Sequence, residues 1–340
     1  MGAVSVDLKG LYSALDGTFS SKGNISSSVG NINLDVEGVY DKSGRLAGTF
    51  DVDTEGFDIG NLLANNSLGE VALTANGKLS LSNGDLNGQI ESHIGYFDYK
   101  GHRFTNIDLK SEKNKENILA ELSVDDALAN LELGGNAVLS GASSTYNISG
   151  DVAYFYPAVF GILPKYDGYA FGGKLVVDIS GNDIDNITGH AGFENLFFTN
   201  NEGKGLTLNT FDLSADNYSI VEKTSDGEDV NKNERRIDFA TDFLTASIKG
   251  EYKFRDLVAG IQDLLSQNVS SFISKPKRGY NANTEAEIRV TLYADEKLPE
   301  FLKLPVKPLK DIEFLSNINL NEGYIDCKME APYCLQGTNK

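Results

Sequence analysis

Apolar and polar residues alternate at every second position along most of this chain, and this alternation constrains the fold more than any other feature. Ile32, Leu34 and Val36 are separated by asparagine and aspartate, and the same pattern returns in many later segments. Because successive side chains of a strand point to opposite faces, such a segment has one apolar and one polar face. Parallel strands covered by helices would instead be apolar throughout. The sequence therefore predicts a mainly all-β protein built on a long antiparallel sheet.

The apolar positions of the alternating segments are the candidate functional residues, because they would meet on one face of the sheet. An uninterrupted apolar face could line a groove, but a packed core between two sheets would show the same alternation. Between residues 118 and 124, for example, Glu121 and Ser123 separate apolar side chains. The predicted groove-lining residues are Ile32, Leu34, Val36, Val71, Leu73, Leu79, Leu81, Ile118, Leu122, Val124, Leu131, Leu133, Leu244, Ile248 and Leu292.

One stretch has the period of a helix rather than that of a strand. From Phe254 to Phe272, apolar residues recur at spacings of three and four, which predicts an amphipathic helix near residues 254–273. Its polar side lacks the Lys and Arg band of a membrane-surface helix, so we expect it to pack against the sheet. Two shorter apolar segments, 57–63 and 155–163, predict helical turns between strands.

These three interruptions are evenly spaced along the chain. They begin at Phe57, Phe155 and Phe254, which are 98 and 99 residues apart. A period of this kind indicates a stacked array rather than a closed globule. One extended β-array is therefore predicted over residues 1–340, divided loosely into units at 1–150, 151–253 and 254–340.

Composition argues against several function classes. The formal net charge is −19, whereas binding to nucleic acid needs a basic surface, so no nucleic-acid partner is expected. The paired carboxylates Asp125 and Asp126 read as turn residues, no nucleophile elbow or phosphate loop is recognised, and the three histidines lack the neighbours of a zinc site. We predict that the protein is not an enzyme and uses no metal or cofactor.

The sequence carries no obvious targeting or membrane-spanning segment. Its longest apolar runs are far shorter than the roughly 20 residues of a spanning helix, and Met1-Gly2-Ala3 begins no recognisable secretory signal. These features are typical of a cytoplasmic protein or of a segment of a longer one. Cys327 and Cys334 could form a disulfide in an oxidising compartment or remain free thiols. The polar stretches 221–236 and 274–287 predict exposed loops.

Four segments combine a strand pattern with turn residues, and they lie at residues 57–69, 95–109, 120–134 and 298–332. The first contains Phe-Asp-Ile-Gly-Asn-Leu-Leu and the second contains Gly-Tyr-Phe-Asp-Tyr-Lys-Gly. In these phrases, which together span much of the chain, the sequence resembles the C-terminal β-rich region of the TamB/AsmA-like family in its Bacteroidetes form. The phrases are degenerate strand and turn patterns rather than catalytic signatures.

The resemblance implies a long sheet curled into a trough (a β-taco), apolar inside and polar outside. It implies a segment of a larger periplasmic protein of the cell envelope that is anchored in the inner membrane. The implied ligands are phospholipid acyl chains, moved between the inner and outer membranes. The implied protein partner is an outer-membrane assembly protein of the TamA/BamA type, with a role in the assembly of outer-membrane proteins and autotransporters.

Two other functions remain open at this point. The chain could be a structural or adhesive surface β-array, a β-helix or a sandwich, with no lipid conduit. It could also be a scaffold that hands client strands to an assembly partner by edge pairing. The first alternative requires the apolar faces to be sealed by a second layer, whereas the conduit requires them to line an open furrow.

Overall fold

The computed structural model describes residues 4–223, 229–268, 274–295, 297–302, 306–308, 310–331 and 334–336. Among these residues, nineteen strands belong to one open antiparallel sheet and the helices are few, which confirms the predicted fold class and fits a curled trough. The chain divides into two compact units. Unit 1 comprises Met1–Ser140, Tyr146–Leu175 and Thr199–Asn201, and unit 2 comprises Gly141–Thr145, Val176–Phe198 and Glu202–Lys340.

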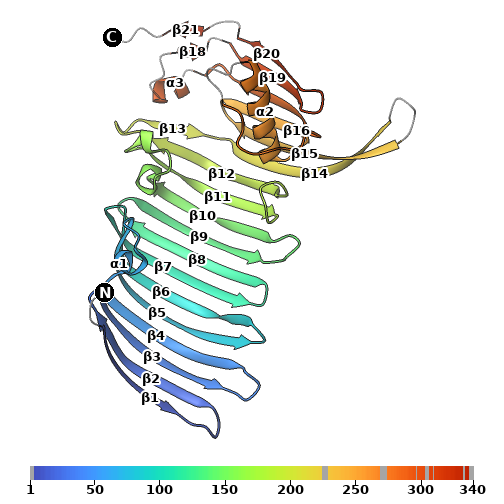
Figure 1. Ribbon diagram of the computed structural model, residues 1–340. Helices are drawn as coiled ribbons and strands as arrows, with labels where there is room; N and C mark the ends of the chain where they lie inside the picture. The colour runs from blue at the N-terminus through green and yellow to red at the C-terminus, as the bar shows by residue number, and fades with distance from the viewer. Residues whose placement is uncertain are drawn as a thin grey trace. The chain divides into compact units, whose positions relative to one another are not determined.

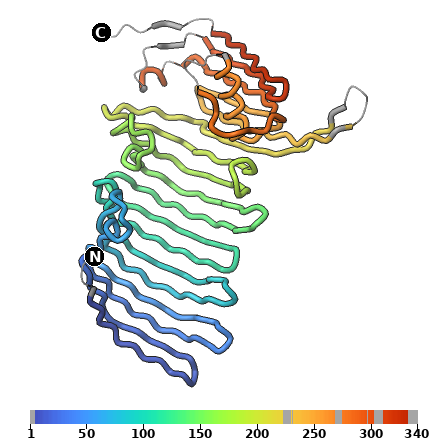
Figure 2. The backbone as a smooth tube through the Cα atoms, viewed as in Figure 1, coloured from blue at the N-terminus to red at the C-terminus, as the bar shows by residue number. Residues whose placement is uncertain are grey.

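Unit 1 is an up-and-down series of long strands in which each strand pairs with the next (Figures 1 and 2). The turns have the required chemistry: Asn83 and Gly84 both have positive φ, as a two-residue hairpin turn demands. The strands are β1 (Val4–Tyr12), β2 (Thr18–Ser27), β3 (Gly30–Tyr40), β4 (Leu46–Asp58), β5 (Leu68–Ser82), β6 (Asp85–Tyr99), β7 (His102–Asn114), β8 (Asn117–Asp126), β9 (Ala129–Val138) and β10 (Thr145–Phe155).

Close packing of backbone shapes the apolar face of unit 1. At Gly77 of β5, an added Cβ would lie 2.8 Å from the ring of Phe50 and would meet the backbone carbonyl of Gln89. Only glycine therefore fits at this position, beneath the phenylalanine ring of β4. Glycines within strands permit the local bends by which a sheet curls.

One margin of unit 1 is closed by aromatic residues. The 3₁₀ turn η1 (Pro157–Phe160) carries Phe160. The centre of the Phe160 ring lies 4.7 Å from the ring centre of Phe155, 5.0 Å from that of Phe104 and 6.4 Å from that of Tyr99. Phe104 is buried, and the ammonium of Lys100 donates to the Phe160 carbonyl over 3.1 Å. We call this edge the aromatic margin. The short helix α1 (Ile59–Leu63), capped by Asp58, and η1 are the two helical turns predicted between strands.

The opposite edge of unit 1 carries the turns between β3 and β4, β5 and β6, and β7 and β8 (Figure 1). We call it the hairpin margin. Leu46, Leu81 and Leu86 at this margin are exposed. The apolar face of unit 1 is therefore packed along one edge and open to solvent along the other.

Unit 2 contains a second run of antiparallel strands. In it, each strand pairs with the next in the order β12, β14, β15, β16, β17, β19 and β20. Their bounds are β12 (Thr188–Thr199), β14 (Phe211–Lys223), β15 (Asp229–Thr241), β16 (Leu244–Glu251), β17 (Glu285–Leu292), β19 (Ile312–Asn319) and β20 (Tyr324–Glu330). Two elements between β10 and β12 are η2 (Pro164–Tyr166), which belongs to unit 1, and β11 (Ala170–Ser180), whose first residues belong to unit 1. The remaining elements of unit 2 are β13 (Gly205–Leu208), α3 (Lys297–Leu302), and β18 (Val306–Pro308) paired with β21 (Cys334–Gln336).

The prediction of an exposed loop over 221–236 is wrong for most of its length. β14 and β15 form a long hairpin whose ladder extends from Phe211 opposite Thr241 to Lys223 opposite Asp229. Towards the tip of the hairpin, Ile220 and Val221 of β14 are adjacent and so project to opposite faces, and they face Lys232 and Asn231 of β15. The sequence therefore shows no alternation there although the backbone ladder continues. The stretch 274–287 is irregular only as far as Thr284, because β17 begins at Glu285.

The predicted amphipathic helix is present as α2 (Phe254–Asn268), and its remaining residues, 269–273, lie outside the described part. Leu257 of α2 is buried in a cluster with Ala286, Ile318 and Leu320. Gly260 allows this close approach, because an added Cβ would overlap the side chain of Leu320. The apolar face of β17 and β19 is therefore covered by a helix, and this part of unit 2 has a conventional core.

Replacing Gly77 by alanine is expected to destabilise the protein, because the added methyl group has no space beneath Phe50. The free energy of unfolding, measured by urea denaturation, should fall by roughly 1–3 kcal/mol. Gly134→Ala is the matched control, because an added Cβ at that position meets no atom within 4 Å. Equal stabilities of the two variants would contradict the close packing at Gly77.

Candidate functional site

The register of the ladder gathers the predicted lining residues of unit 1 on one face. Leu122 lies opposite Leu109 on one side and Leu133 on the other, and Leu34 lies opposite Val52. Residues directly opposite each other in an antiparallel pair project to the same face. By this criterion the following predicted residues share one face, which extends from β1 to β9 and which we call the apolar face: Ile32, Leu34, Val36, Val71, Leu73, Leu79, Leu81, Ile118, Leu122, Val124, Leu131 and Leu133.

The same register adds residues to the apolar face that are not among the predicted lining residues. Several of them lie in segments where glycine, serine or a bulge interrupts the alternation, as between Thr54 and Phe57. These segments also alternate with a period of two, but the alternation continues for too few residues between interruptions to predict a strand face. These additional residues include Phe50, Val52, Ile90, Ile94, Ile107 and Leu109.

Most predicted side chains of the apolar face are partly buried but still accessible to solvent. Along β8, Ile118, Ala120 and Leu122 are half-buried while Leu119 and Glu121 on the opposite face are exposed. Of the predicted residues, only Val71, at 6% exposure, is fully buried. Neighbouring apolar side chains shield one another along the ladder, and the lower exposure of this face fits a curled sheet. Most of these side chains remain partly accessible to solvent, unlike those of a packed interior.

Open hollows follow the strands of unit 1. One of about 980 Å³ spans β1 to β6, and most of its lining side chains, such as Glu37, Thr49 and Lys78, belong to the opposite, polar face of the sheet. This hollow therefore lies on the polar side of the sheet, and the apolar face is defined by strand register and side-chain exposure.

Formal charges are nearly excluded from the apolar face. Across β1 to β9, the register places only two charged residues of the Asp, Glu, Lys and Arg types on it, and each lies near a margin. Asp126, at 6% exposure, accepts hydrogen bonds from the Thr105 amide, the Thr105 hydroxyl and the Leu128 amide. The second is Lys113, at the hairpin margin. An unpaired charge in the middle of the face would cost several kcal/mol against apolar contents.

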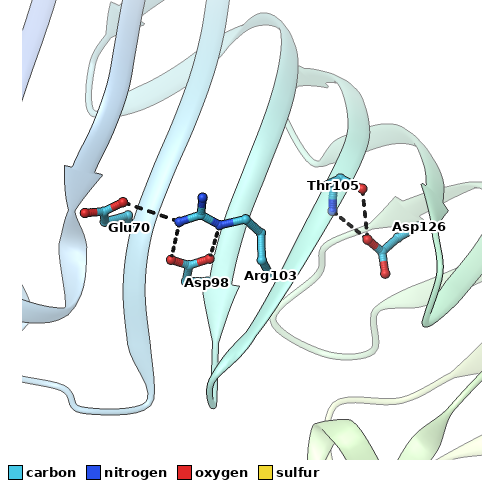
Figure 3. A network of polar contacts seen from close by, with 5 residues as sticks. All are labelled: Glu70, Asp98, Arg103, Thr105 and Asp126. Carbon is cyan, nitrogen blue, oxygen red and sulfur yellow. Dashed lines mark hydrogen bonds and ion pairs between the residues drawn. The ribbon is translucent and has the colours of Figure 1, made fainter.

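A network of polar contacts on the opposite face ties β5, β6 and β7 together (Figure 3). Arg103 makes a bidentate ion pair with Asp98, with N–O distances of 2.7 and 2.8 Å, and reaches Glu70 at 3.4 Å. Its guanidinium also lies 3.9 Å from the centre of the Tyr96 ring. The register of β5 against β6 shifts on either side of Val71, next to Glu70. The network therefore fixes the strands where the regular ladder is interrupted.

Arg103 shifts the protonation of its partner. Its hydrogen bond to the carboxylate lowers the pKa of Asp98 below the ordinary value of 3.8, and the same bond raises the pKa of Arg103. A carboxyl group whose pKa is lower in the folded protein stabilises it above the unfolded-state pKa, and this contribution disappears as the pH falls through the folded-state pKa. The network should therefore act at neutral pH and fail in acid.

Replacing Asp98 by asparagine tests whether the ion pair with Arg103 stabilises the protein at neutral pH and not in acid. At pH 7 the variant should unfold at a lower temperature than the wild type, because the bidentate pair is lost. Below the lowered pKa of Asp98 the difference should vanish, since the wild-type carboxyl is then neutral as well. Thermal unfolding followed by circular dichroism at pH 7 and in acid measures both values. A difference in Tm that is the same at both pH values would show that the ion pair contributes nothing.

Histidine and aspartate meet twice on exposed sheet surfaces. His93 lies 2.8 Å from Asp108, and His190 lies 2.8 Å from Asp212. Each pair joins neighbouring strands, and all four side chains are about half exposed. Within the described ranges no cluster of three potential metal ligands is found. The arrangement is that of surface cross-strand pairs.

The three predicted lining residues of unit 2 lie together on β16 and β17. Leu244 is opposite Leu292, and Ile248 is opposite Ile288. Ile248 packs against the core cluster beneath α2, so the helix occupies the space over this position. Tyr252 belongs to the same core, and its burial raises the pKa of its hydroxyl to about 12.

Cys327 carries a free, exposed thiol on β20, where its Sγ lies 3.3 Å from the Ser316 hydroxyl oxygen. The side chain of Cys334, its predicted alternative partner, lies outside the described part. Among the helices that the structure describes, none is both long and apolar enough to cross a bilayer. No protein-family model matches the chain, and no significant match is found among curated proteins or solved structures.

Proposed function

We propose that unit 1 is a groove that carries the acyl chains of phospholipids. The observation that supports this most is the apolar face of β1 to β9, which is continuous and free of charge away from its margins, and on which most of the predicted lining residues are half-buried. A purely structural sheet would gain more stability by covering that face with a second layer. In unit 2 the helix α2 provides such a cover over β17 and β19, and no equivalent helix is described over the apolar face of unit 1.

The energetics of hydrocarbon favour an uninterrupted face. The two tails of a phospholipid contain roughly 30 methylenes, and each contributes about 0.8 kcal/mol when it is kept from water. Exposing even a third of them would cost several kcal/mol, which is enough to halt movement along the groove. Neighbouring apolar rows, such as those of Leu109, Leu122 and Leu133, allow a tail to pass from strand to strand without crossing a charged side chain.

The wider setting is proposed on the resemblance to the TamB/AsmA-like family. In that setting the chain is a segment of a larger, non-enzymatic protein of the periplasm or cell envelope, anchored in the inner membrane. Its groove would carry phospholipid between the inner and outer membranes. Its protein partner would be an outer-membrane assembly protein of the TamA/BamA type, and it would support the assembly of outer-membrane proteins and autotransporters.

Placing a carboxylate in the middle of the groove should abolish lipid binding. We expect the wild-type chain, purified from bacterial envelope extracts, to co-isolate with phospholipids detectable by mass spectrometry. In Leu122→Asp the bound lipid should fall by at least roughly ten-fold, because an unpaired carboxylate costs several kcal/mol against hydrocarbon. Circular dichroism should show that strand content is retained.

The matched control is Leu119→Asp, which makes the same substitution on the opposite face of the same strand. Leu119 is 53% exposed, so the variant should bind as much lipid as the wild type. Loss of lipid from both variants would point to unfolding rather than to a blocked groove. Absence of lipid from the wild-type chain in several detergents would contradict the proposal and favour a structural β-array.

A further inference from the structure

The one lysine on the apolar face of β1 to β9 has no acidic partner. Lys113 lies near the end of β7, directly opposite Gly88 of β6 and Ile118 of β8. Its side chain is half-buried. In a chain of net charge −19, no described carboxylate lies within ion-pair distance of this ammonium group.

Backbone carbonyl groups hold the ammonium at the hairpin margin. The Nζ atom of Lys113 donates to the carbonyl oxygen of Leu86 over 2.8 Å and to that of Lys115 over 2.7 Å. An ammonium group has three N–H donors, so one donor remains for a ligand. The positive charge is thus fixed where the open edge of the apolar face meets water.

Lys113 lies between the apolar middle of the sheet and an exposed turn. On the same face, Ser111 and Ala120 come next towards the middle of the sheet, and Leu109 and Leu122, which lie opposite each other, follow them. On the other side of Lys113 the chain turns between Asn114 and Asn117. A lipid whose tails lie over Leu109 and Leu122 would therefore bring its headgroup to this turn.

We propose that Lys113 binds the phosphate of a phospholipid whose acyl chains occupy the groove. An ammonium group is a common phosphate ligand in proteins because a charge-assisted hydrogen bond to a phosphate oxygen is among the stronger polar contacts. The inference rests on the proposed function and deepens it, because it assigns a fixed orientation to the lipid. The phosphate lies at the hairpin margin, and the tails extend towards the aromatic margin.

The test compares two lipids that share acyl chains but differ in the phosphate. The purified chain is loaded with a fluorescent polyunsaturated fatty acid, which is then displaced by phosphatidylglycerol or by diacylglycerol. Wild-type protein should bind phosphatidylglycerol more tightly. In Lys113→Met the affinity for phosphatidylglycerol should fall about ten-fold, the loss of one charge-assisted hydrogen bond, while the affinity for diacylglycerol stays the same.

Two further variants separate a ligand contact from a structural role. Lys113→Arg retains the charge and should retain the preference for phosphatidylglycerol. Lys110→Met removes an exposed lysine from the opposite face of the same strand and should change neither affinity. An equal loss for both lipids in Lys113→Met, or no loss for either, would overturn the assignment of Lys113. Failure of both lipids to displace the probe from the wild type would instead overturn the proposed function.

Discussion

The register of consecutive antiparallel pairs is the constraint on which the rest of this structure depends. Because side chains alternate with a period of two, a slip of one residue would move every leucine and valine of a strand to the opposite face. The ladder of unit 1 keeps the apolar positions together from β1 to β9, even across the bulges near Thr54 and Val71. The continuous apolar face follows directly from this register.

Local departures from the regular ladder give that face its shape. Gly77 lets the Phe50 ring lie directly on the backbone, and the network around Arg103 holds β5, β6 and β7 where the register shifts. The aromatic margin then closes one edge, while the hairpin margin exposes leucines to solvent. Unit 2 follows the same strand pattern but places α2 on its apolar face, so a similar pattern of residues produces a core there and a furrow in unit 1.

The sequence could predict the strands and their apolar sides, because a period of two is a local property that each segment shows by itself. It could also predict α2, whose spacing differs from that of the strands. The outer part of the β14–β15 hairpin is not predictable in this way, because Ile220 and Val221 are adjacent and the facing part of β15 is mostly polar, so no alternation is present. The position of Lys113 on the apolar face was missed because it depends on pairing with Gly88 and Ile118, which no single segment reveals.

Whether a furrow or a core is present could not be decided from the sequence either, since both bury alternate residues. Leu79 and Ile248 occupy the same kind of position in their strands, yet Leu79 belongs to an uncovered face and Ile248 packs beneath a helix. The difference lies in contacts between segments far apart in the chain. Sequence periodicity therefore predicts which residues share a face, whereas the tertiary packing determines what that face contacts.

Chemical labelling of one residue tests the central claim, that the apolar face of unit 1 is accessible. A variant with Cys327 and Cys334 replaced by serine and Leu79 replaced by cysteine would be treated with a water-soluble thiol reagent under native conditions. The account predicts that this thiol reacts far faster than global unfolding allows, and that added phospholipid slows the reaction. A thiol that reacts only as fast as the protein unfolds would show that Leu79 lies in a closed core and would contradict the account.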